Sequence, residues 1–79
     1  MLPIIAHANK YANKVAIYAN GNAYQYKQLL HESKNLSYKL LNNKKDLFES
    51  RVAFMVSPGF NYVKTLWAIW QAGGIAVPL

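Results

Sequence analysis

The segment at residues 51–79 constrains the fold more than any other part of the sequence. Residues 51–57 (RVAFMVS) form a near-continuous apolar run, which is typical of a strand buried on both faces of a parallel sheet. Residues 60–72 (FNYVKTLWAIWQA) would form a helix that is apolar on almost every side and must therefore be buried in something larger. Residues 75–79 begin a second apolar strand. This order predicts a parallel βαβ unit, right-handed by the general rule.

Glycine and proline mark the two ends of the predicted helix. Ser57-Pro58-Gly59 ends the first strand and is a candidate helix cap, with an anion on the helix N-terminus as a second interpretation. Gly73-Gly74 follows the helix and precedes a strand, which is the position of a helix C-cap. A dinucleotide-binding loop would instead need its glycines between a strand and the next helix, so this pair is not predicted to bind phosphate.

A β-hairpin is predicted over residues 15–26 (VAIYANGNAYQY). Asn20-Gly21 separates two β-rich runs, and a type I′ turn needs positive φ at both of its central residues. A short helix is predicted before it over residues 2–12, with Pro3 in the first turn, where the missing N–H costs little. Asn13-Lys14 would end that helix.

An amphipathic helix is predicted over residues 27–43, and a polar loop follows it from Asn42 to Lys45. Its apolar stripe comprises Tyr26, Leu29, Leu30, Ser33, Leu36, Ser37, Leu40 and Leu41. The fold class is thus α/β: an N-terminal helix, a hairpin, an amphipathic helix and a right-handed βαβ unit. The sequence shows neither a repeat nor a linker, so no domain boundary is expected within residues 1–79. Because helix 60–72 must be buried in something larger, we expect the chain to be one incomplete piece of a larger domain.

The net charge of +6 raises the possibility of nucleic-acid binding, but the distribution of charge argues against it. Eight lysines and one arginine are spread along the chain, and Lys44-Lys45 is the only adjacent pair. No arginine cluster with interleaved aromatic residues indicates a groove or stacking platform. We therefore expect a solvated basic surface and no nucleic-acid partner.

The residues that could carry chemistry are few. Glu32 is predicted on the polar side of the amphipathic helix, and Asp46 and Glu49 lie in or near the following loop, so no carboxylate pair is placed for acid–base work or Mg²⁺. Ser33 is predicted to be a small packing residue, because no histidine or acid is placed to activate it.

The histidines and tryptophans also have ordinary interpretations. His7 and His31 lack the spacing of a metal site and are predicted to be surface imidazoles. Trp67 and Trp70 lie three apart on the apolar helix and are predicted core residues, not a ligand-stacking cage. No cysteine is present, which excludes disulfides and thiolate metal sites. We predict no catalytic, cofactor-binding or metal-ligating residue in this chain.

The compartment expected from the sequence is the cytoplasm. No apolar run approaches the roughly 20 residues that span a bilayer, so no membrane partner is expected. Residues 1–14 carry neither a basic residue before the apolar stretch nor arginine, which makes them a poor signal or transit peptide.

Five segments in order resemble the adenylate-forming ligases, the family of acyl-CoA synthetases and peptide-synthetase adenylation domains. After an N-terminal helix, residues 15–26 look like the family hairpin that ends in T/S-Y, and Leu29, Ser33, Leu36 and Leu40 resemble its next helix. Residues 51–60 (RVAFMVSPGF) are similar to R-V-A-hydrophobic₃-x-N-S-P-E-F, although Ser50 replaces the usual Asp and Gly59 the usual Glu. Residues 67–79 (WAIWQAGGIAVPL) resemble the family's A-G-A/G-hydrophobic-x-V-P-L, and this ending is similar to that of the malonyl-CoA synthetase-like branch.

The resemblance implies an activity that this chain does not contain. Such enzymes use ATP and Mg²⁺ to convert a carboxylate into an acyl-adenylate, and coenzyme A then takes the acyl group, as in fatty acid metabolism. The family's phosphate loop, ribose-binding acid and catalytic lysine lie downstream and match no position here. The matched residues belong to the scaffold, so we expect no activity from this chain alone.

Three interpretations of the chain remain open. It is an incomplete ligase (a truncated gene product, the first piece of a split gene, or a fragment), a binding module that docks through helix 60–72 and an open sheet edge, or a small stand-alone α/β domain. In the first two, the missing remainder of a ligase is the expected partner. Exposed apolar surface also predicts self-association.

Overall fold

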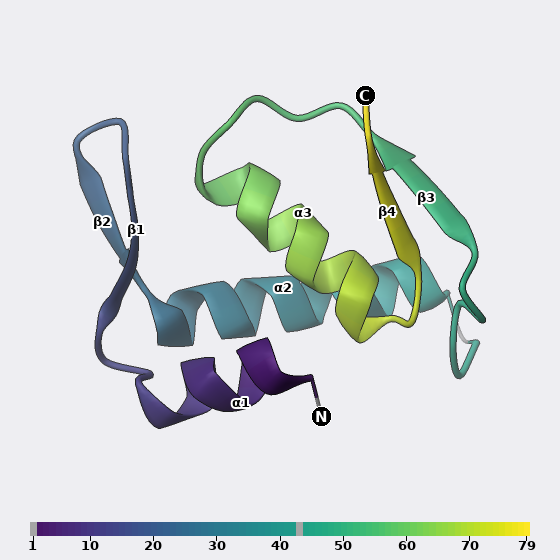
Figure 1. Cartoon of the computed structure of the whole chain (residues 1–79), viewed down its shortest axis with the longest axis horizontal. Helices are drawn as coiled ribbons and strands as arrows, with labels where there is room; N and C mark the ends of the chain where they lie inside the picture. Colours follow the sequence, from purple (N-terminus) through teal and green to yellow (C-terminus); the bar gives the residue numbers. More distant parts are fainter. Residues whose placement is uncertain (1, 43) are drawn as a thin grey trace.

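The computed structural model describes residues 2–42 and 44–79, which form three helices and four short strands in two small sheets. The order is α1 (Pro3–Lys10), β1 (Val15–Ala19), β2 (Asn22–Gln25), α2 (Tyr26–Leu41), β3 (Arg51–Phe54), α3 (Phe60–Gln71) and β4 (Ile75–Pro78). Figure 1 shows α2 across the middle, with α1 below it, α3 above it, the hairpin at one end and the β3–β4 pair at the other. The predicted α/β class is confirmed.

The hairpin forms as the Asn-Gly pair predicts. Strands β1 and β2 are antiparallel, and the two turn residues Asn20 and Gly21 have φ of 52° and 77°. These positive values are those that the right-handed twist of a two-residue hairpin requires. A register shift between Val15 and Ile17 bends the first strand.

Helix α1 starts with Pro3 in its first turn and buries Ile5 and Ala8, which confirms the predicted helix with slightly shorter ends. Helix α2 ends where Asn42 adopts a left-handed conformation, with φ of 46°. Asparagine tolerates this conformation well, which explains why a polar residue ends the helix there. The structure thus confirms the predicted stop at the start of the polar loop.

The core lies where the three helices meet the hairpin. A buried cluster comprises Ile5, Ala8, Leu29, Phe60 and Trp67. Two aromatic contacts tie the β2–α2 segment to α3: the rings of Tyr24 and Phe60 stack at 4.3 Å, and those of Tyr26 and Trp67 lie 6.4 Å apart. Such pairs add a directional contribution to the burial of apolar area.

Helix α3 packs mainly on α2. Along α2 the fully or nearly fully buried side chains include Ser33 and Ser37, and α3 contributes Ala68, Ile69 and Ala72. Small side chains let two helices approach closely, since the distance between helix axes depends on the side chains at the contact. Pattern alone identified the apolar faces but not this pairing.

The βαβ unit has the predicted topology. Strands β3 and β4 are parallel neighbours, with Val52 opposite Ala76 and Phe54 opposite Pro78. The Phe54 ring lies 5.5 Å from the ring of Tyr62, so this face of the pair is turned towards α3. The right-handed crossover stays a prediction from the general rule.

The opposite face of the β3–β4 pair is uncovered, which corrects the prediction of a strand buried on both faces. We call this the outer sheet face; it comprises Arg51, Ala53, Ile75 and Val77. All but the half-buried Val77 are exposed, and Ile75 keeps 46% of its surface. Strand β3 also stops at Phe54, three residues earlier than predicted, and Met55 is 81% exposed. The described residues supply α3 for one face and no layer for the other.

Gly73 and Gly74 complete the helix C-cap that the sequence predicts. Gly73 has φ of 83°, its N–H donates to the Trp70 carbonyl (3.1 Å), and the Gly74 N–H donates to the Ile69 carbonyl (2.9 Å). This pair of bonds is the Schellman arrangement. The loop before β3 also attaches here, because the Leu47 N–H donates to the Ala72 carbonyl at 2.8 Å.

Gly73→Ala is expected to destabilise the chain more than Gly21→Ala. Both glycines have positive φ, so both substitutions strain the backbone by about 1 kcal/mol. A Cβ at Gly73 would also meet the carboxylate of Asp46, whose Oδ1 accepts a hydrogen bond from the Phe48 N–H (2.6 Å), whereas a Cβ at Gly21 meets open space. The helical circular dichroism signal of Gly73→Ala should therefore be lost at a lower urea concentration than that of Gly21→Ala, a comparison that needs no cooperative transition. Equal losses for the two variants would contradict this account of the cap.

Candidate functional site

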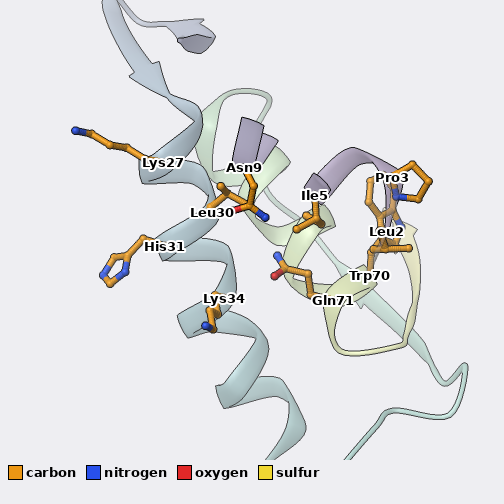
Figure 2. A pocket seen from close by; sticks show the side chains of 10 residues that line it. All are labelled: Leu2, Pro3, Ile5, Asn9, Lys27, Leu30, His31, Lys34, Trp70 and Gln71. Atoms are coloured by element: carbon orange, nitrogen blue, oxygen red, sulfur yellow. The ribbon is translucent and has the colours of Figure 1, made fainter. Parts of the chain in front are cut away.

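An open groove of about 920 Å³ lies between α1, α2 and the end of α3 (Figure 2). It is lined by Leu2, Pro3, Ile5, Asn9, Lys27, Leu30, His31, Lys34, Trp70 and Gln71. Its position follows from the packing, because α1 lies beside the first half of α2, whereas the last turn of α3 meets α2 near its middle, at Ser33.

The floor and the rim of this groove differ in chemistry. Ile5, Leu30 and Trp70 are apolar, and Trp70 keeps 38% of its surface exposed. Lys27, His31 and Lys34 follow one another on successive turns of α2 and form one rim, from which the side chains of Lys27 and His31 extend outward, away from the apolar floor (Figure 2). None of the lining residues, all of which belong to the described ranges, is acidic. The groove therefore combines an apolar floor with a basic rim.

The sequence contains a signal for this rim, which the predictions above missed. Lys27, His31 and Lys34 are spaced four and three residues apart, which places them on one side of a helix. They flank Leu30, a member of the predicted apolar stripe. What pattern alone could not show is that α1 and Trp70 stand opposite them, because that depends on tertiary packing.

The two tryptophans have different environments. Trp67 is 4% exposed and belongs to the core, as predicted, whereas Trp70 lies at the surface and lines the groove, so the prediction of a core residue is wrong for Trp70. The physical reason is helix geometry. Side chains three residues apart on α3 point in directions that differ by about 60°, so the Trp67 ring faces the core whereas the Trp70 ring lies at the edge of the core.

Ser33 is a buried packing residue, as predicted. It is fully buried, and its Oγ donates to the Leu30 carbonyl (3.2 Å) and accepts from Gln71 Nε2 (2.8 Å). These contacts join α2 to α3 and satisfy the hydroxyl that burial would otherwise leave without partners. Neither contact is with a base, so the arrangement is structural.

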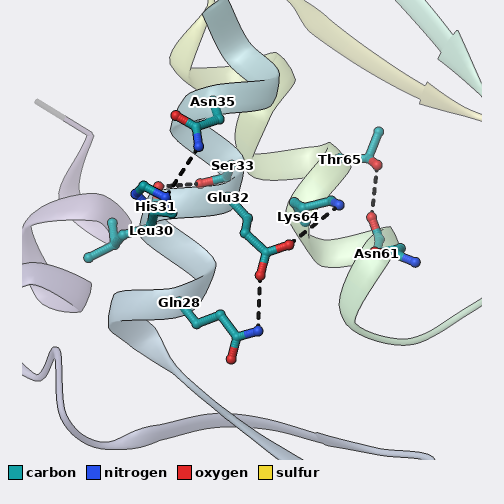
Figure 3. A network of polar contacts seen from close by, with 9 residues as sticks. All are labelled: Gln28, Leu30, His31, Glu32, Ser33, Asn35, Asn61, Lys64 and Thr65. Carbon is teal, nitrogen blue, oxygen red and sulfur yellow. Dashed lines mark hydrogen bonds and ion pairs between the residues drawn. The ribbon is translucent and has the colours of Figure 1, made fainter.

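Glu32 faces α3 and not solvent alone, which refines its predicted place on the polar side of the helix. One oxygen accepts a hydrogen bond from Gln28 Nε2 (2.9 Å), and the other lies 3.8 Å from Lys64 Nζ (Figure 3). The pair is partly exposed, and such ion pairs contribute about 0–1 kcal/mol. Glu32 thus connects the two helices at their solvent-facing edge.

Asp46 and Glu49 line one shallow depression beside Gly73, so the structure brings together two acids that the sequence places in one loop. The Asp46 carboxylate already accepts a hydrogen bond from the Phe48 N–H. Within residues 2–42 and 44–79, no group of three or more His, Cys, Asp or Glu side chains is placed to hold a metal ion.

Both histidines lie at the surface, as predicted. The His7 ring packs 4.7 Å from the ring of Tyr11 and 6.0 Å from that of Tyr26. His31 Nε2 lies 3.3 Å from Asn35 Nδ2 one turn further along α2 (Figure 3). These neighbours explain the positions of both imidazoles without a metal.

The strand-to-helix turn at Ser57-Pro58-Gly59 does not form the predicted side-chain cap. Gly59 occupies the N-cap position with φ of 139°, and no side chain caps the helix, so Ser57 is not the cap. A hollow of about 350 Å³ lies here, lined by Ala19, Asn20, Tyr24, Val56, Ser57, Pro58, Gly59, Phe60 and Asn61. Because none of these is basic, the lining offers an anion no charge beyond that of the helix end.

Comparison with known proteins gives consistent matches to one kind of enzyme. The human protein named malonate–CoA ligase ACSF3, mitochondrial, is 31% identical over 81 residues, and the mouse protein of that name is 33% identical over 82; the matches cover 98% and 99% of this chain. The Xenopus laevis protein is 29% identical over 83 residues. The chain is similar to the N-terminal part of these CoA ligases. The predicted resemblance to adenylate-forming, acyl-CoA synthetase-like ligases is thereby confirmed.

The matches cover a small part of each relative. The chain spans 14% of the length of these relatives, at their N-terminal end. No protein-family model matches the chain. Among the described helices, none is both long and apolar enough to cross a membrane.

Proposed function

We propose that the chain is the N-terminal scaffold of an ATP-dependent acyl-CoA synthetase-like ligase and that it is not catalytic alone. In this role residues 1–79 form the first part of an adenylate-forming domain. The complete ligase would activate a carboxylate as its acyl-adenylate and transfer the acyl group to coenzyme A. The names of the relatives make malonate the first acid to test.

The uncovered outer sheet face is the observation that carries this proposal. Parallel sheets occur almost only where both faces are covered. Here α3 covers one face, whereas Arg51, Ala53 and Ile75 on the other are exposed. A two-stranded parallel pair also has two open edges, and open edges pair readily with further strands. Both features are expected of a sheet that continues with strands and a layer from elsewhere.

The residues of this chain do not fit the cofactors of the family. The turn before α3 carries no basic side chain in its lining, which a triphosphate would need in addition to backbone N–H groups. Glu32 is paired with Lys64, and Asp46 is bonded to the Phe48 N–H, so neither is poised as a Mg²⁺ ligand. We therefore assign ATP, Mg²⁺ and coenzyme A to other parts of the ligase.

A binding module that docks through α3 and the sheet edge is the alternative function. Its support is reduced by the packing of α3, because α2 covers much of the surface that was expected to be free and buries Trp67, Ala68 and Ile69. The open sheet edges support the alternative and the leading proposal equally. The partner in both is the remainder of a ligase.

The compartment stays a prediction. We propose the cytoplasm, the compartment expected from the sequence. The relatives, in contrast, carry "mitochondrial" in their names. Fluorescence microscopy of the natural gene product, tagged at its C-terminus, decides between the two.

The transcript downstream of the Leu79 codon tests the proposal most cheaply. We expect the reading frame, or an adjacent frame, to continue into a Ser/Thr/Gly-rich loop that ends in lysine. That segment is the phosphate-binding part of a ligase. A long unrelated region in its place would reject the ligase scaffold and favour a module or a stand-alone domain.

A further inference from the structure

The groove between α1, α2 and α3 lies apart from the outer sheet face that carries the proposed scaffold. The two surfaces share no residue. Its floor of Ile5, Leu30 and Trp70 is apolar, and one rim is basic. An apolar groove along a helix is the shape that receives the apolar face of a second helix.

We propose that this groove binds an acidic amphipathic helix of a protein partner. The basic rim runs from Lys27 to Lys34, which is two helical turns and about 10.5 Å along α2. A partner helix whose apolar stripe rests on Leu30 and Trp70 would present one edge to this rim. Acidic side chains along that edge complement Lys27 and Lys34, and they meet no acid in the groove lining.

Charge also argues against a second copy of this chain as the occupant. The chain carries a net charge of +6 and has three acidic residues. Of these, Glu32 is paired with Lys64 and Asp46 is bonded to the Phe48 N–H. Two copies would place basic surface against basic surface, and like charges across an interface oppose binding. The open form and two-turn length of the rim favour a helix over a small carboxylate.

The test uses a fluorescent helical peptide of 18 residues with leucines on one face and glutamates along one edge of that face. Fluorescence anisotropy should report saturable binding to the 79-residue chain at a dilution where sedimentation shows monomer and circular dichroism shows that the helices are formed. A second peptide with lysines in place of the glutamates should bind at least about tenfold more weakly, because it meets the same rim with the wrong charge.

Charge reversal on the chain locates the site. Lys27→Glu with Lys34→Glu should weaken binding of the acidic peptide about tenfold or more. Lys14→Glu with Lys39→Glu is the matched control: it changes the net charge equally at two exposed positions outside the groove lining, and it should leave binding within about twofold. The Lys27/Lys34 variant should in turn prefer the lysine peptide, a gain that loss of folding could not produce.

Four results would overturn the proposal. They are no binding of the acidic peptide, equal binding of both peptides, equal weakening by the two charge reversals, and displacement of the peptide by myristate at concentrations that saturate the groove. The last would assign the groove to a small carboxylate amphiphile. None of these results bears on the ligase scaffold, which the downstream transcript tests separately.

Discussion

The purified chain is expected to self-associate through its outer sheet face and to lack the cooperative unfolding of an ordinary domain. Exposed apolar side chains next to open strand edges favour association. Here Ile75 is 46% exposed, and Met55 and Leu79, just beyond the two strands, are 81% and 75% exposed. Sedimentation velocity should therefore show oligomers whose size grows with concentration. The dye ANS should bind strongly, as it does to loosely packed apolar surface.

Placing charge on that face should reduce the association. Ala53→Lys with Ile75→Lys adds two positive charges to the outer sheet face, where they repel a second copy. Tyr18→Lys with Ala23→Lys is the matched control, since these two exposed residues are paired across the hairpin, away from that sheet. We expect the first variant to shift most of the protein to monomer at a concentration where the control remains oligomeric.

A cooperatively folded monomer would contradict the expected self-association. A dilute monomer of the natural sequence that unfolds in one cooperative transition, with a stability above about 5 kcal/mol, would behave as an ordinary domain. It would show that leaving the outer sheet face uncovered lowers the stability of the chain only slightly, and it would favour a stand-alone α/β domain over a scaffold. Equal association of the two lysine variants would instead place the contact elsewhere on the molecule.

Local sequence signals predicted the parts of the fold that depend on backbone conformation. Asn20-Gly21 produced the hairpin, and Gly73 adopts the left-handed conformation that a helix C-cap needs. The order strand, helix, strand gave the parallel pairing of β3 with β4. In the two turns, the residue type itself favours the observed backbone conformation. The parallel pairing follows instead from the order of the elements along the chain.

Relations between elements could not be read from the sequence in the same way. The apolar stripe of α2 specifies a face but not the element that covers it, and that element proved to be α3, through Ser33 and its bond to Gln71. An apolar strand such as β3 also looks identical whether its covering layers lie in this chain or in another. The exposed Trp70 and the groove beside it are consequences of the same packing, so pattern alone did not reveal them.

The second large effect concerns catalysis: the isolated chain should not exchange pyrophosphate into ATP. Enzymes accelerate reactions at least about 10⁶-fold, largely through groups positioned around the developing charge. Phosphoryl and adenylyl chemistry needs cations and donors arranged about the phosphates. Within residues 2–42 and 44–79, Ser33 is buried in a helix contact, Glu32 is paired with Lys64, and the turn before α3 has no basic lining residue.

Pyrophosphate exchange is therefore the measurement that tests the scaffold account most directly. The purified 79-residue chain would be incubated with ATP, Mg²⁺, labelled pyrophosphate and malonate, then with other carboxylic acids. A mock purification from host cells that lack the gene, made in parallel, detects contaminating ligase, because host enzyme would be present in both preparations. The account predicts no label in ATP above the protein-free control with any acid. Robust exchange by the natural sequence, absent from the parallel preparation, would contradict it.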